Sequence, residues 1–324
     1  MAGELILAGA AAGAAALAVA ARAAAREAAA EAAHPPCGEI LTLSGRRIHA
    51  LSQGAGPDLV LIHGASGNLR DFFPGLGEAL ATRFRVTAFD RPGLGYSDRA
   101  APDLAHPLAR RGESPGEQAA LLHRAAAALG LRRPLLLGHS YGAAVAMAWA
   151  LDHGDDVAGV LALSGATMPW PGSLDPLYRI GGTALGGALL APLGAALTPR
   201  SYMARVIAAI FSPDPVPPGY ARQVGAGLAL RRATLRANLR QINGLRPHVV
   251  AMAARYRHLA LPVEILHGTA DRIVPAAIHA GPLAALLPDG ALTLLQGTGH
   301  MPHHAAPAAV IAAIDRLAAR AGLH

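Results

Sequence analysis

Gly138-His139-Ser140-Tyr141-Gly142 fits the pattern G-x-S-x-G. An apolar run at 135–137 precedes it and predicts a buried strand, and an alanine-rich helical segment at 143–151 follows it. A turn between strand and helix strains the serine backbone, and the flanking glycines let the two elements pack without a Cβ clash. We therefore expect the Ser140 hydroxyl to stand at the carboxyl end of the strand as a nucleophile. The alternative is an ordinary serine in a glycine-rich loop, and the flanking strand and helix favour the nucleophile.

A serine hydroxyl is a weak nucleophile at neutral pH, so it needs a base and an acid that orients the base. After a serine in this setting, the acid and then the base follow along the chain. The predicted strand at 263–268 leads to Asp271, and the predicted last strand at 292–295 leads to His300. We predict that Asp271 orients His300, and that His300 accepts the Ser140 proton.

Other histidines near the predicted strand ends have simpler explanations. His267 lies within a predicted strand, and His139 is expected to pack behind the serine. His303 and His304 open the last predicted helix and are expected to be exposed. No metal site is predicted at 300–304, because a proline interrupts the run and no carboxylate ligand lies nearby in the sequence.

The oxyanion that forms when a carbonyl is attacked needs hydrogen-bond donors, and a glycine loop can supply them. The apolar run at 59–62 predicts a strand, and His63-Gly64-Ala65-Ser66-Gly67 follows it. We predict that the backbone N–H groups of Ala65 and Tyr141 bind the oxyanion. Ser66, in the same loop, is predicted to contact the substrate. The alternative for this loop is an ordinary turn.

These motifs together resemble those of the α/β-hydrolase superfamily, and the resemblance covers residues 39–167 and 260–320. Within the superfamily, the chain is similar to the bacterial capped hydrolases that have a serine nucleophile. The resemblance rests on five stretches: His63-Gly64-Ala65-Ser66-Gly67, Asp90-Arg91-Pro92-Gly93-Leu94-Gly95-Tyr96-Ser97, Gly138-His139-Ser140-Tyr141-Gly142, Gly268-Thr269-Ala270-Asp271 and Gly297-Thr298-Gly299-His300.

The resemblance implies an α/β fold with an eight-stranded, mostly parallel sheet, helices on both faces and a helical lid inserted after the sixth strand. On this basis residues 34–167 and 260–324 form the core, and residues 168–259 form the lid. Residues 1–33 precede the core as an apolar helix. From the pattern alone, the segment at 40–51 predicts a hairpin at the antiparallel edge of the sheet.

The predicted function is that of a serine hydrolase that cleaves a carboxylic ester or a related acyl bond through an acyl-enzyme. The substrate is expected to be a small apolar or amphiphilic acyl compound, and neither a metal nor an organic cofactor is needed. Ser140 argues against epoxide hydrolases and haloalkane dehalogenases, which resemble this chain but carry aspartate there, and against dienelactone hydrolases, which carry cysteine. Two enzymatic alternatives use the same triad: a carbon–carbon bond hydrolase, and a cofactor-free perhydrolase or haloperoxidase-like enzyme. A non-catalytic, membrane-bound ligand-binding protein is the alternative from another class.

The charged residues exclude some functions. All 28 basic residues are arginine, which excludes Schiff-base chemistry on lysine and a P-loop. Eleven of the arginines lie at 168–260 against only Asp175 and Asp214, so the net charge of +7 comes from the predicted lid. Nucleic-acid binding is not expected, because the arginines lack an aromatic platform or a known module. Cys37 is the single cysteine, so no intramolecular disulfide forms.

The predicted lid contains an apolar, glycine-rich segment at 180–197, which Pro192 is expected to break, and a basic amphipathic helix. The arginine face of that helix either rests on anionic headgroups, attracts an anionic substrate, or is simply solvated. Trp170, near the expected pocket mouth, either contacts the substrate or packs at a hinge. The basic helix is identified by the spacing of Leu228, Leu235, Leu239 and Ile242 beside Arg231, Arg232, Arg236 and Arg240.

The N-terminal run at 5–21 is uncharged and just long enough to span a membrane. Met1 to Glu4 lacks the positive side chain that a cleavable signal peptide favours, whereas Arg22 and Arg26 flank the other end of the run. We therefore predict an uncleaved membrane anchor, with the catalytic domain in the cytoplasm by the positive-inside rule. The alternatives are an exported protein with a signal peptide and a soluble cytoplasmic protein with an alanine-rich helix.

Overall fold

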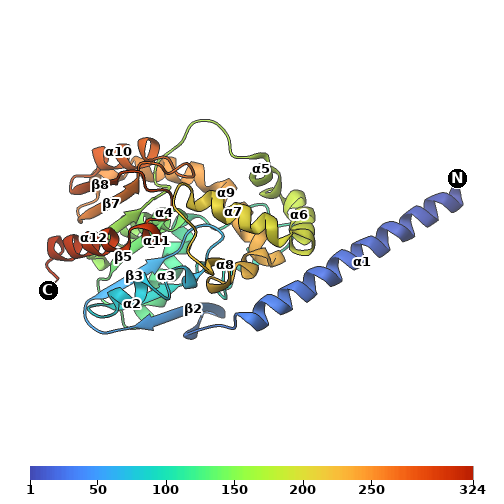
Figure 1. Cartoon of the computed structure of the whole chain (residues 1–324), viewed down its shortest axis with the longest axis horizontal. Coiled ribbons are helices and arrows are strands. Elements are labelled where there is room, and N and C mark those ends of the chain that lie inside the picture. The colour runs from blue at the N-terminus through green and yellow to red at the C-terminus, as the bar shows by residue number, and fades with distance from the viewer. Residues whose placement is uncertain (324) are drawn as a thin grey trace.

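The computed structural model describes residues 1–323, and a single eight-stranded sheet lies at its centre (Figure 1). The strands are β1 (Glu39–Leu43), β2 (Arg46–Gln53), β3 (Asp58–Ile62), β4 (Arg85–Phe89), β5 (Leu135–His139), β6 (Gly159–Leu163), β7 (Val263–Gly268) and β8 (Gly290–Leu295). Their order across the sheet is β1-β2-β4-β3-β5-β6-β7-β8. β1 and β2 pair antiparallel, β2 runs antiparallel to β4, and the remaining neighbours are parallel. The predicted hairpin at the edge and the mostly parallel sheet are confirmed.

Helices surround this sheet and extend well beyond it. The α-helices are α1 (Ala2–Ala33), α2 (Leu76–Leu80), α3 (Pro115–Ala128), α4 (Tyr141–Asp152), α5 (Pro176–Gly181), α6 (Ala184–Leu197), α7 (Arg200–Phe211), α8 (Tyr220–Gln223), α9 (Arg232–Ala253), α10 (Ala276–Leu286), α11 (Pro302–Ala305) and α12 (Pro307–Arg320). Five short 3-10 helices join them: η1 (Leu69–Asp71), η2 (Pro102–Ala105), η3 (Gly154–Asp156), η4 (Ala226–Leu230) and η5 (Tyr256–His258).

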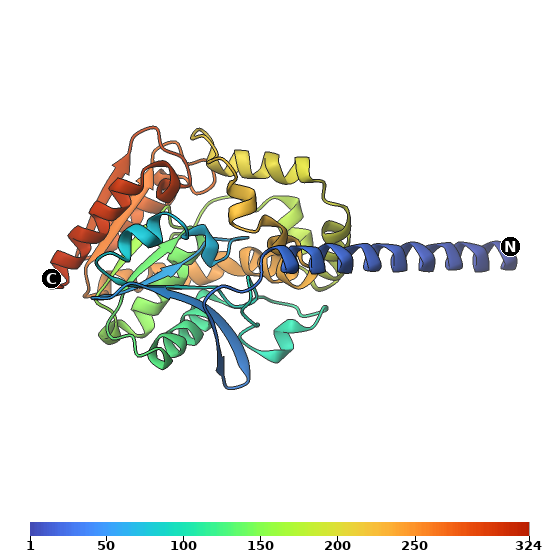
Figure 2. The ribbon, with the colours of Figure 1, turned by 60° about the horizontal axis from the view of Figure 1, so that its bottom comes forward.

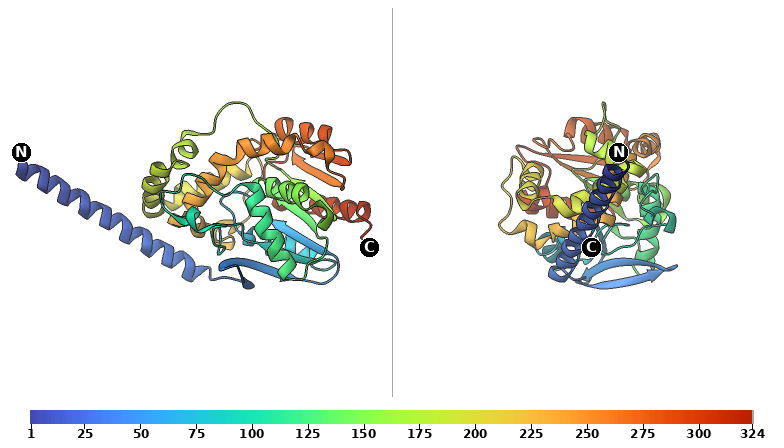
Figure 3. Two further views of the ribbon diagram at one scale, coloured as in Figure 1. Left: turned by 180° about the vertical axis from the view of Figure 1, so that it is seen from behind. Right: turned by 90° about the vertical axis from the view of Figure 1, so that its right-hand side faces the viewer.

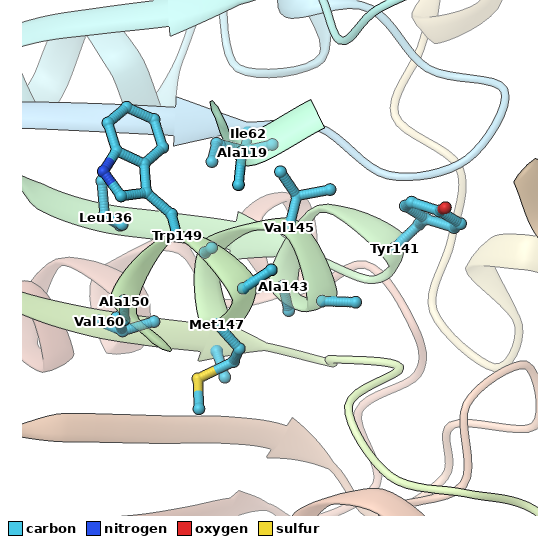
Figure 4. Close-up of a cluster of buried hydrophobic side chains, with 14 of the residues drawn as sticks. Ile62, Ala119, Leu136, Tyr141, Ala143, Val145, Met147, Trp149, Ala150 and Val160 are labelled. Carbon is cyan, nitrogen blue, oxygen red and sulfur yellow. The ribbon is translucent and has the colours of Figure 1, made fainter. Parts of the chain in front are cut away.

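Buried apolar side chains form one layer on each face of the sheet, between the sheet and the helices that cover it. One layer packs α3, α4 and α10 against one face, and the other packs α2 and α12 against the opposite face. β3, β5, β6 and β7 are buried along their whole length, as expected of parallel strands that are covered on both faces. Figure 4 shows Trp149 of α4 beside Leu136 of β5 in the first layer, with Val145 farther along the same helix toward Tyr141. The small side chains of α4 let the whole helix lie close against the sheet.

The segment between β6 and β7, residues 168–259, carries α5 to α9 and is called the cap below. Pro192 does not break its apolar segment, because α6 runs through this proline to Leu197. The break comes earlier, where the Thr183 hydroxyl accepts a hydrogen bond from the Gly186 amide at 3.0 Å. This N-cap bond marks the start of α6, because the hydroxyl satisfies one of the amides that have no partner in the first turn.

α1 projects from the domain as a long rod (Figures 2 and 3). By length and composition, its Leu7–Ala33 portion could cross a membrane, with a mean hydropathy of 1.6. Its other end is attached to the cap: Val19 and Ala23 pack on Ala195 and Ala196 at the end of α6. The C-terminal half of α1 is therefore docked on the cap, whereas the side chains at 7–18 are exposed.

The arginines of α9 do not form the free basic face that the sequence predicts. Arg232 forms a salt bridge with Glu27 of α1 at 2.7 Å, and Arg231 pairs with Glu31 at 2.9 Å. Arg240 is buried and donates hydrogen bonds to backbone carbonyl groups at 106 and 107. Acidic side chains of α1 therefore cover the start of α9, and the arginines there are paired within the protein rather than free.

Candidate active site

The turn between β5 and α4 holds Ser140 in an unusual backbone conformation. Its φ is 54°, in the left-handed region that non-glycine residues rarely adopt. A Cβ on Gly138 would lie 2.3 Å from the Gly142 carbonyl oxygen, and a Cβ on Gly142 would lie 2.1 Å from that of Ile62. Both positions therefore require glycine, as the strand–turn–helix interpretation predicts.

The structure brings the side chains of Ser140, His300 and Asp271 into one hydrogen-bonded chain. The Ser140 hydroxyl lies 3.0 Å from His300 Nε2, and His300 Nδ1 lies 2.7 Å from Asp271 Oδ2. All three residues are buried, and each stands just beyond the carboxyl end of a strand. In this arrangement His300 Nδ1–H donates to the carboxylate, and Nε2 is left to accept from the serine. The contacts agree with the predicted pairing, and the catalytic roles remain predictions.

Several donors keep Asp271 ionised. Its Oδ1 accepts hydrogen bonds from the backbone amides of Ile273 and Val274, each at 2.9 Å. Burial alone would raise the pKa of the carboxyl group, but the hydrogen bonds from His267 and His300 hold it well below its ordinary value. The carboxylate is therefore fixed in place and charged, which suits a group that orients a histidine.

The loop after β3 passes directly over the nucleophile. A Cβ on Gly64 would lie only 3.2 Å from Ser140 Cβ, so the backbone of this loop and the serine are in close contact. The Gly64 carbonyl oxygen accepts two hydrogen bonds, from His63 Nδ1 at 2.8 Å and from Arg91 Nη2 at 3.1 Å. The carbonyl group that precedes the Ala65 amide is thus held from two sides.

Arg91 is a functional candidate that the sequence analysis did not single out. It is completely buried, and its guanidinium lies 4.4 Å from the centre of the Tyr141 ring. It also donates to the side-chain oxygens of Gln118 and Gln241, at 2.8 and 3.1 Å. Burial lowers the pKa of Arg91 to about 10, so it stays charged at neutral pH. A buried cation therefore contacts the Tyr141 ring and the carbonyl oxygen that precedes the Ala65 amide, next to both predicted oxyanion donors.

The two predicted substrate contacts lie in different settings. Ser66 is exposed, and Asn238 of α9 binds it twice: the Ser66 amide donates to Asn238 Oδ1, and Asn238 Nδ2 donates to Ser66 Oγ, both at 2.8 Å. Trp170 is partly buried against the core, with its ring 6.1 Å from that of His279. Ser66 thus joins the loop over the nucleophile to the cap, while Trp170 packs where the cap leaves β6.

A second polar cluster lies behind the first, and it corrects the expectation for His303 and His304. His303 is buried and His304 half-buried, because both donate from Nε2 to the Asp71 carboxylate, at 3.1 and 3.0 Å. The Tyr220 hydroxyl of α8 donates to the same carboxylate at 2.7 Å. Burial would raise the pKa of Asp71, but the two histidines hold it well below its ordinary value.

Asp71 also changes the argument against a metal at 300–304. No carboxylate lies near 300–304 in the sequence, yet Asp71 contacts both histidines, although it lies 232 positions before His303. No local pattern marks it, because it follows the loop at 63–67 in the short 3-10 helix η1. In the structure its oxygens are satisfied by three donors, two imidazoles and one phenol.

His139 and the cap reach the His300 segment from two further sides. His139 packs behind the serine as predicted, and its Nε2–H donates to the His300 carbonyl oxygen at 2.9 Å. Burial holds the pKa of His139 well below its ordinary value, so the ring is neutral. From the cap, the Asp214 carboxylate accepts a hydrogen bond from the Gly299 amide at 2.7 Å. The backbone on either side of the imidazole is therefore fixed by groups from distant parts of the chain.

Comparison with known proteins agrees with this architecture. A protein-family model described as the alpha/beta hydrolase family matches residues 59–313. A pimeloyl-[acyl-carrier protein] methyl ester esterase of Edwardsiella ictaluri is 30% identical over 281 residues, which cover 82% of this chain and 95% of the esterase. An uncharacterized protein of Mycobacterium tuberculosis is 27% identical over 289 residues, which cover 87% of this chain and 81% of that protein.

Solved structures show the same fold. An alpha/beta hydrolase fold protein from Burkholderia ambifaria has a TM-score of 0.68 and 25% identity, covering 85% of this chain and 96% of its own. A membrane phospholipase A, described as a bacterial virulence factor, has a TM-score of 0.67 and 21% identity, covering 97% of each chain. The second likeness concerns the fold alone, and it extends over nearly the full length of the present chain.

Proposed function

Because the chain belongs to the alpha/beta hydrolase family and is a hydrolase, we propose that it cleaves carboxylic esters through an acyl-enzyme formed on Ser140. The observation that carries the proposal is the hydrogen-bonded chain from Ser140 Oγ through His300 to Asp271, at 3.0 and 2.7 Å. A serine in such a chain is activated for attack on a carbonyl carbon.

The proposed reaction follows from these contacts. Ser140 Oγ attacks the ester carbonyl carbon while His300 Nε2 takes the hydroxyl proton, and the Ala65 and Tyr141 amides bind the oxyanion. The protonated His300 then gives its proton to the leaving alkoxide, which departs as the alcohol. A water molecule, deprotonated by His300, then attacks the carbonyl carbon of the acyl-enzyme. The bond from that carbon to Ser140 Oγ breaks, His300 returns the proton to Ser140 Oγ, and the carboxylic acid is released. Asp271 stabilises the imidazolium in both steps.

The ester as substrate class is supported by two considerations. The Edwardsiella ictaluri relative is by its name a methyl ester esterase, and it aligns with most of this chain. A serine at position 140 is also the nucleophile that ester cleavage by this mechanism requires. The acyl group is proposed to be apolar or amphiphilic.

We further propose that α1 is retained in the mature protein as a membrane anchor, with the catalytic domain in the cytoplasm. The support is the docked half of α1: Arg22 and Arg26 donate to the carbonyl groups that end α6, at 2.7 to 2.8 Å. Cleavage of a signal sequence would remove these contacts. N-terminal sequencing of the protein from isolated membranes tests retention. Full recovery of the protein in a salt-only wash would contradict the anchor.

A fluorophosphonate probe, which labels activated serines covalently, tests the catalytic proposal. The unaltered chain should be labelled and should hydrolyse p-nitrophenyl esters of graded acyl length. Ser140→Ala should lose both, with an unchanged thermal unfolding midpoint. Ser201→Ala, at an exposed serine of the cap, is the matched control and should retain both. Labelling of Ser140→Ala at the original rate would overturn the assignment, and an unlabelled native chain would favour a non-catalytic binding protein.

A further inference from the structure

One helix of the cap exposes its most apolar side chains. On α6, Leu185, Leu189, Leu193 and Leu197 are spaced four residues apart and are 70, 66, 42 and 56% exposed. Residues with this spacing lie along one side of a helix. The opposite side of α6, which carries glycine and alanine, is the buried one. The helix is thus turned with its large apolar side outward, the reverse of an ordinary surface helix.

The surroundings of α6 extend this apolar area. α6 itself contains no charged residue, and neighbouring α5 exposes Leu177 and Ile180, at 48 and 57%. Single exposed leucines are common on soluble proteins, but a contiguous group of them marks an interaction site. We call these six side chains the leucine face: Leu177, Ile180, Leu185, Leu189, Leu193 and Leu197.

The level at which α6 packs along α1 indicates which partner covers the leucine face. α6 packs against Val19 and Ala23, the level at which the uncharged run of α1 ends. A helix that spans a bilayer over residues 5–21 would leave the hydrocarbon at this level. The two arginines at this level, Arg22 and Arg26, are directed to the carbonyl groups at the end of α6. α6 therefore meets α1 at the expected depth of the membrane interface.

From these relationships we propose that the leucine face lies in the interfacial layer of the same phospholipid bilayer that α1 crosses. Figure 1 shows α5 and α6 at the end of the domain from which α1 projects. The proposal rests on α1 as an anchor and not on the esterase activity. The proposed partner of the leucine face is lipid. Amphipathic helices of other proteins bind in the same way, lying in the membrane interface with the apolar side toward the acyl chains. A second copy of this chain is the competing occupant.

Depth-dependent fluorescence in vesicles tests the proposal without any enzyme assay. The full chain carries Cys37→Ser and either Leu189→Cys or Leu294→Cys, labelled with an environment-sensitive dye. Leu294 is the matched control: it is 43% exposed, on β8 at the edge of the sheet. The proteins are reconstituted at high lipid-to-protein ratio in phosphatidylcholine–phosphatidylglycerol vesicles, with and without lipids that carry a nitroxide quencher.

The expected result is a blue-shifted emission at position 189 that lipid-borne nitroxide quenches, with solvent-like, unquenched emission at position 294. Solvent-like emission at position 189 in membrane-inserted protein would overturn the proposal. So would a blue shift that no nitroxide lipid quenches and that disappears on dilution with lipid, because this result identifies a second copy as the occupant. Membrane insertion itself is checked by carbonate extraction, which separates a failure of the leucine face from a failure of the anchor.

A hydrolysis assay gives a second readout. Leu185→Gln with Leu189→Gln should reduce the rate on a long-chain ester embedded in vesicles and leave the rate on a soluble short-chain ester unchanged. Equal rates of the variant and the unaltered protein on the embedded ester, in vesicles where the unaltered protein hydrolyses it, would contradict a leucine face that lies in the bilayer.

Discussion

Arg91 Nη2 donates a hydrogen bond to the Gly64 carbonyl oxygen at 3.1 Å. The peptide unit is planar and trans, so fixing this C=O also fixes the direction of the Ala65 N–H on its other side. His63 holds the same oxygen from Nδ1, and its Nε2 accepts the Arg91 amide at 3.0 Å, which fixes the tautomer. The two residues together hold in place the amide proposed to bind the oxyanion.

Replacing Arg91 should therefore impair turnover more than substrate binding. Losing an oxyanion donor outright costs roughly 100- to 1000-fold in rate, and because Arg91 acts through a peptide it only orients, we expect a fall in kcat of about 10- to 100-fold for Arg91→Met. KM should change little, and a boronic acid that mimics the tetrahedral intermediate should bind more weakly. Arg91→Lys should recover part of kcat, because lysine restores one charged donor.

Arg240→Met provides the matched control for this prediction. Arg240 is also buried and also donates to backbone carbonyl oxygens, but at 106 and 107. Both variants leave buried acceptors without a donor, so each should lower the free energy of unfolding, by about 1–3 kcal/mol. Equal losses of kcat in the two variants would show that Arg91 acts only through stability.

The Asp71 cluster gives a second prediction, on the segment that carries His300. Asp71→Asn replaces an ionised acceptor of three hydrogen bonds by an amide whose NH2 group faces one of the imidazole donors. We expect the free energy of unfolding to fall by about 3 kcal/mol, and kcat to fall as well, because His303 and His304 directly continue the His300 loop. Urea unfolding and ester hydrolysis measure the two effects.

Tyr220→Phe tests whether the tyrosine or the two histidines contribute more to holding Asp71 in place. It leaves the carboxylate with both histidines and removes one hydrogen bond to a charged group, so a smaller loss of about 1.5 kcal/mol is expected. If this variant loses as much stability as Asp71→Asn, the contact with the cap, and not the pair of histidines, holds Asp71 in place.

Sequence and structure agree best where the signal is local. Ser140, Asp271 and His300 each come shortly after a strand that the sequence pattern predicts. Parallel strands bring their carboxyl ends to one edge of the sheet, so these three side chains meet there. The role of Asp71 could not be predicted, because its partners His303 and His304 lie 232 and 233 positions away and no motif surrounds it. The pairing of Arg232 with Glu27 spans 205 positions, so the sequence pattern could not predict it either. A helix pattern predicts which side is polar, but not which charges from elsewhere cover that side.

The free energy of unfolding should fall on both the acid and the alkaline side of neutral pH. Burial lowers the pKa of His63 from 6.5 to about 4, so between these values the unfolded chain binds a proton that the folded chain does not. The stabilisation is complete above pH 6.5 and is lost as the pH falls through 4, by an amount on the order of 3 kcal/mol. His139 and His303, whose pKa values are also lowered by burial, add to this acid limb.

His49 acts in the opposite direction. Burial alone would lower its pKa, but the hydrogen bond to Asp90 at 2.6 Å raises it to about 9. Its stabilisation is complete below pH 6.5 and is lost as the pH rises through 9. Urea midpoints measured from pH 4 to 10 should therefore fall on both sides, and His49→Gln should flatten the alkaline limb only. An alkaline limb that is unchanged in this variant would contradict the assignment.

The last prediction concerns Glu27 and the start of α9. Glu27 Oε1 accepts hydrogen bonds from the Arg232 backbone amide at 2.6 Å and from Arg232 Nε at 2.9 Å. Arg231, at the N-cap position of α9, provides no side-chain cap, so α1 supplies the carboxylate that the first turn of this helix lacks. Glu27→Gln should lower the stability of the cap by about 1 kcal/mol, because the site is partly exposed and screened by solvent.

Limited trypsin digestion detects this local loss, since cleavage after Arg231 and Arg232 needs the start of α9 to open. The rate of cleavage at these bonds should rise in Glu27→Gln, whereas cleavage in α12 should not change. Glu31→Gln is the control, because Glu31 contacts only the Arg231 side chain and is half-exposed, so its loss should have little effect. Identical cleavage rates in the Glu27 and Glu31 variants would show that α1 does not cap α9. Faster cleavage in Glu27→Gln alone would make the N-terminal helix part of the structure of the cap.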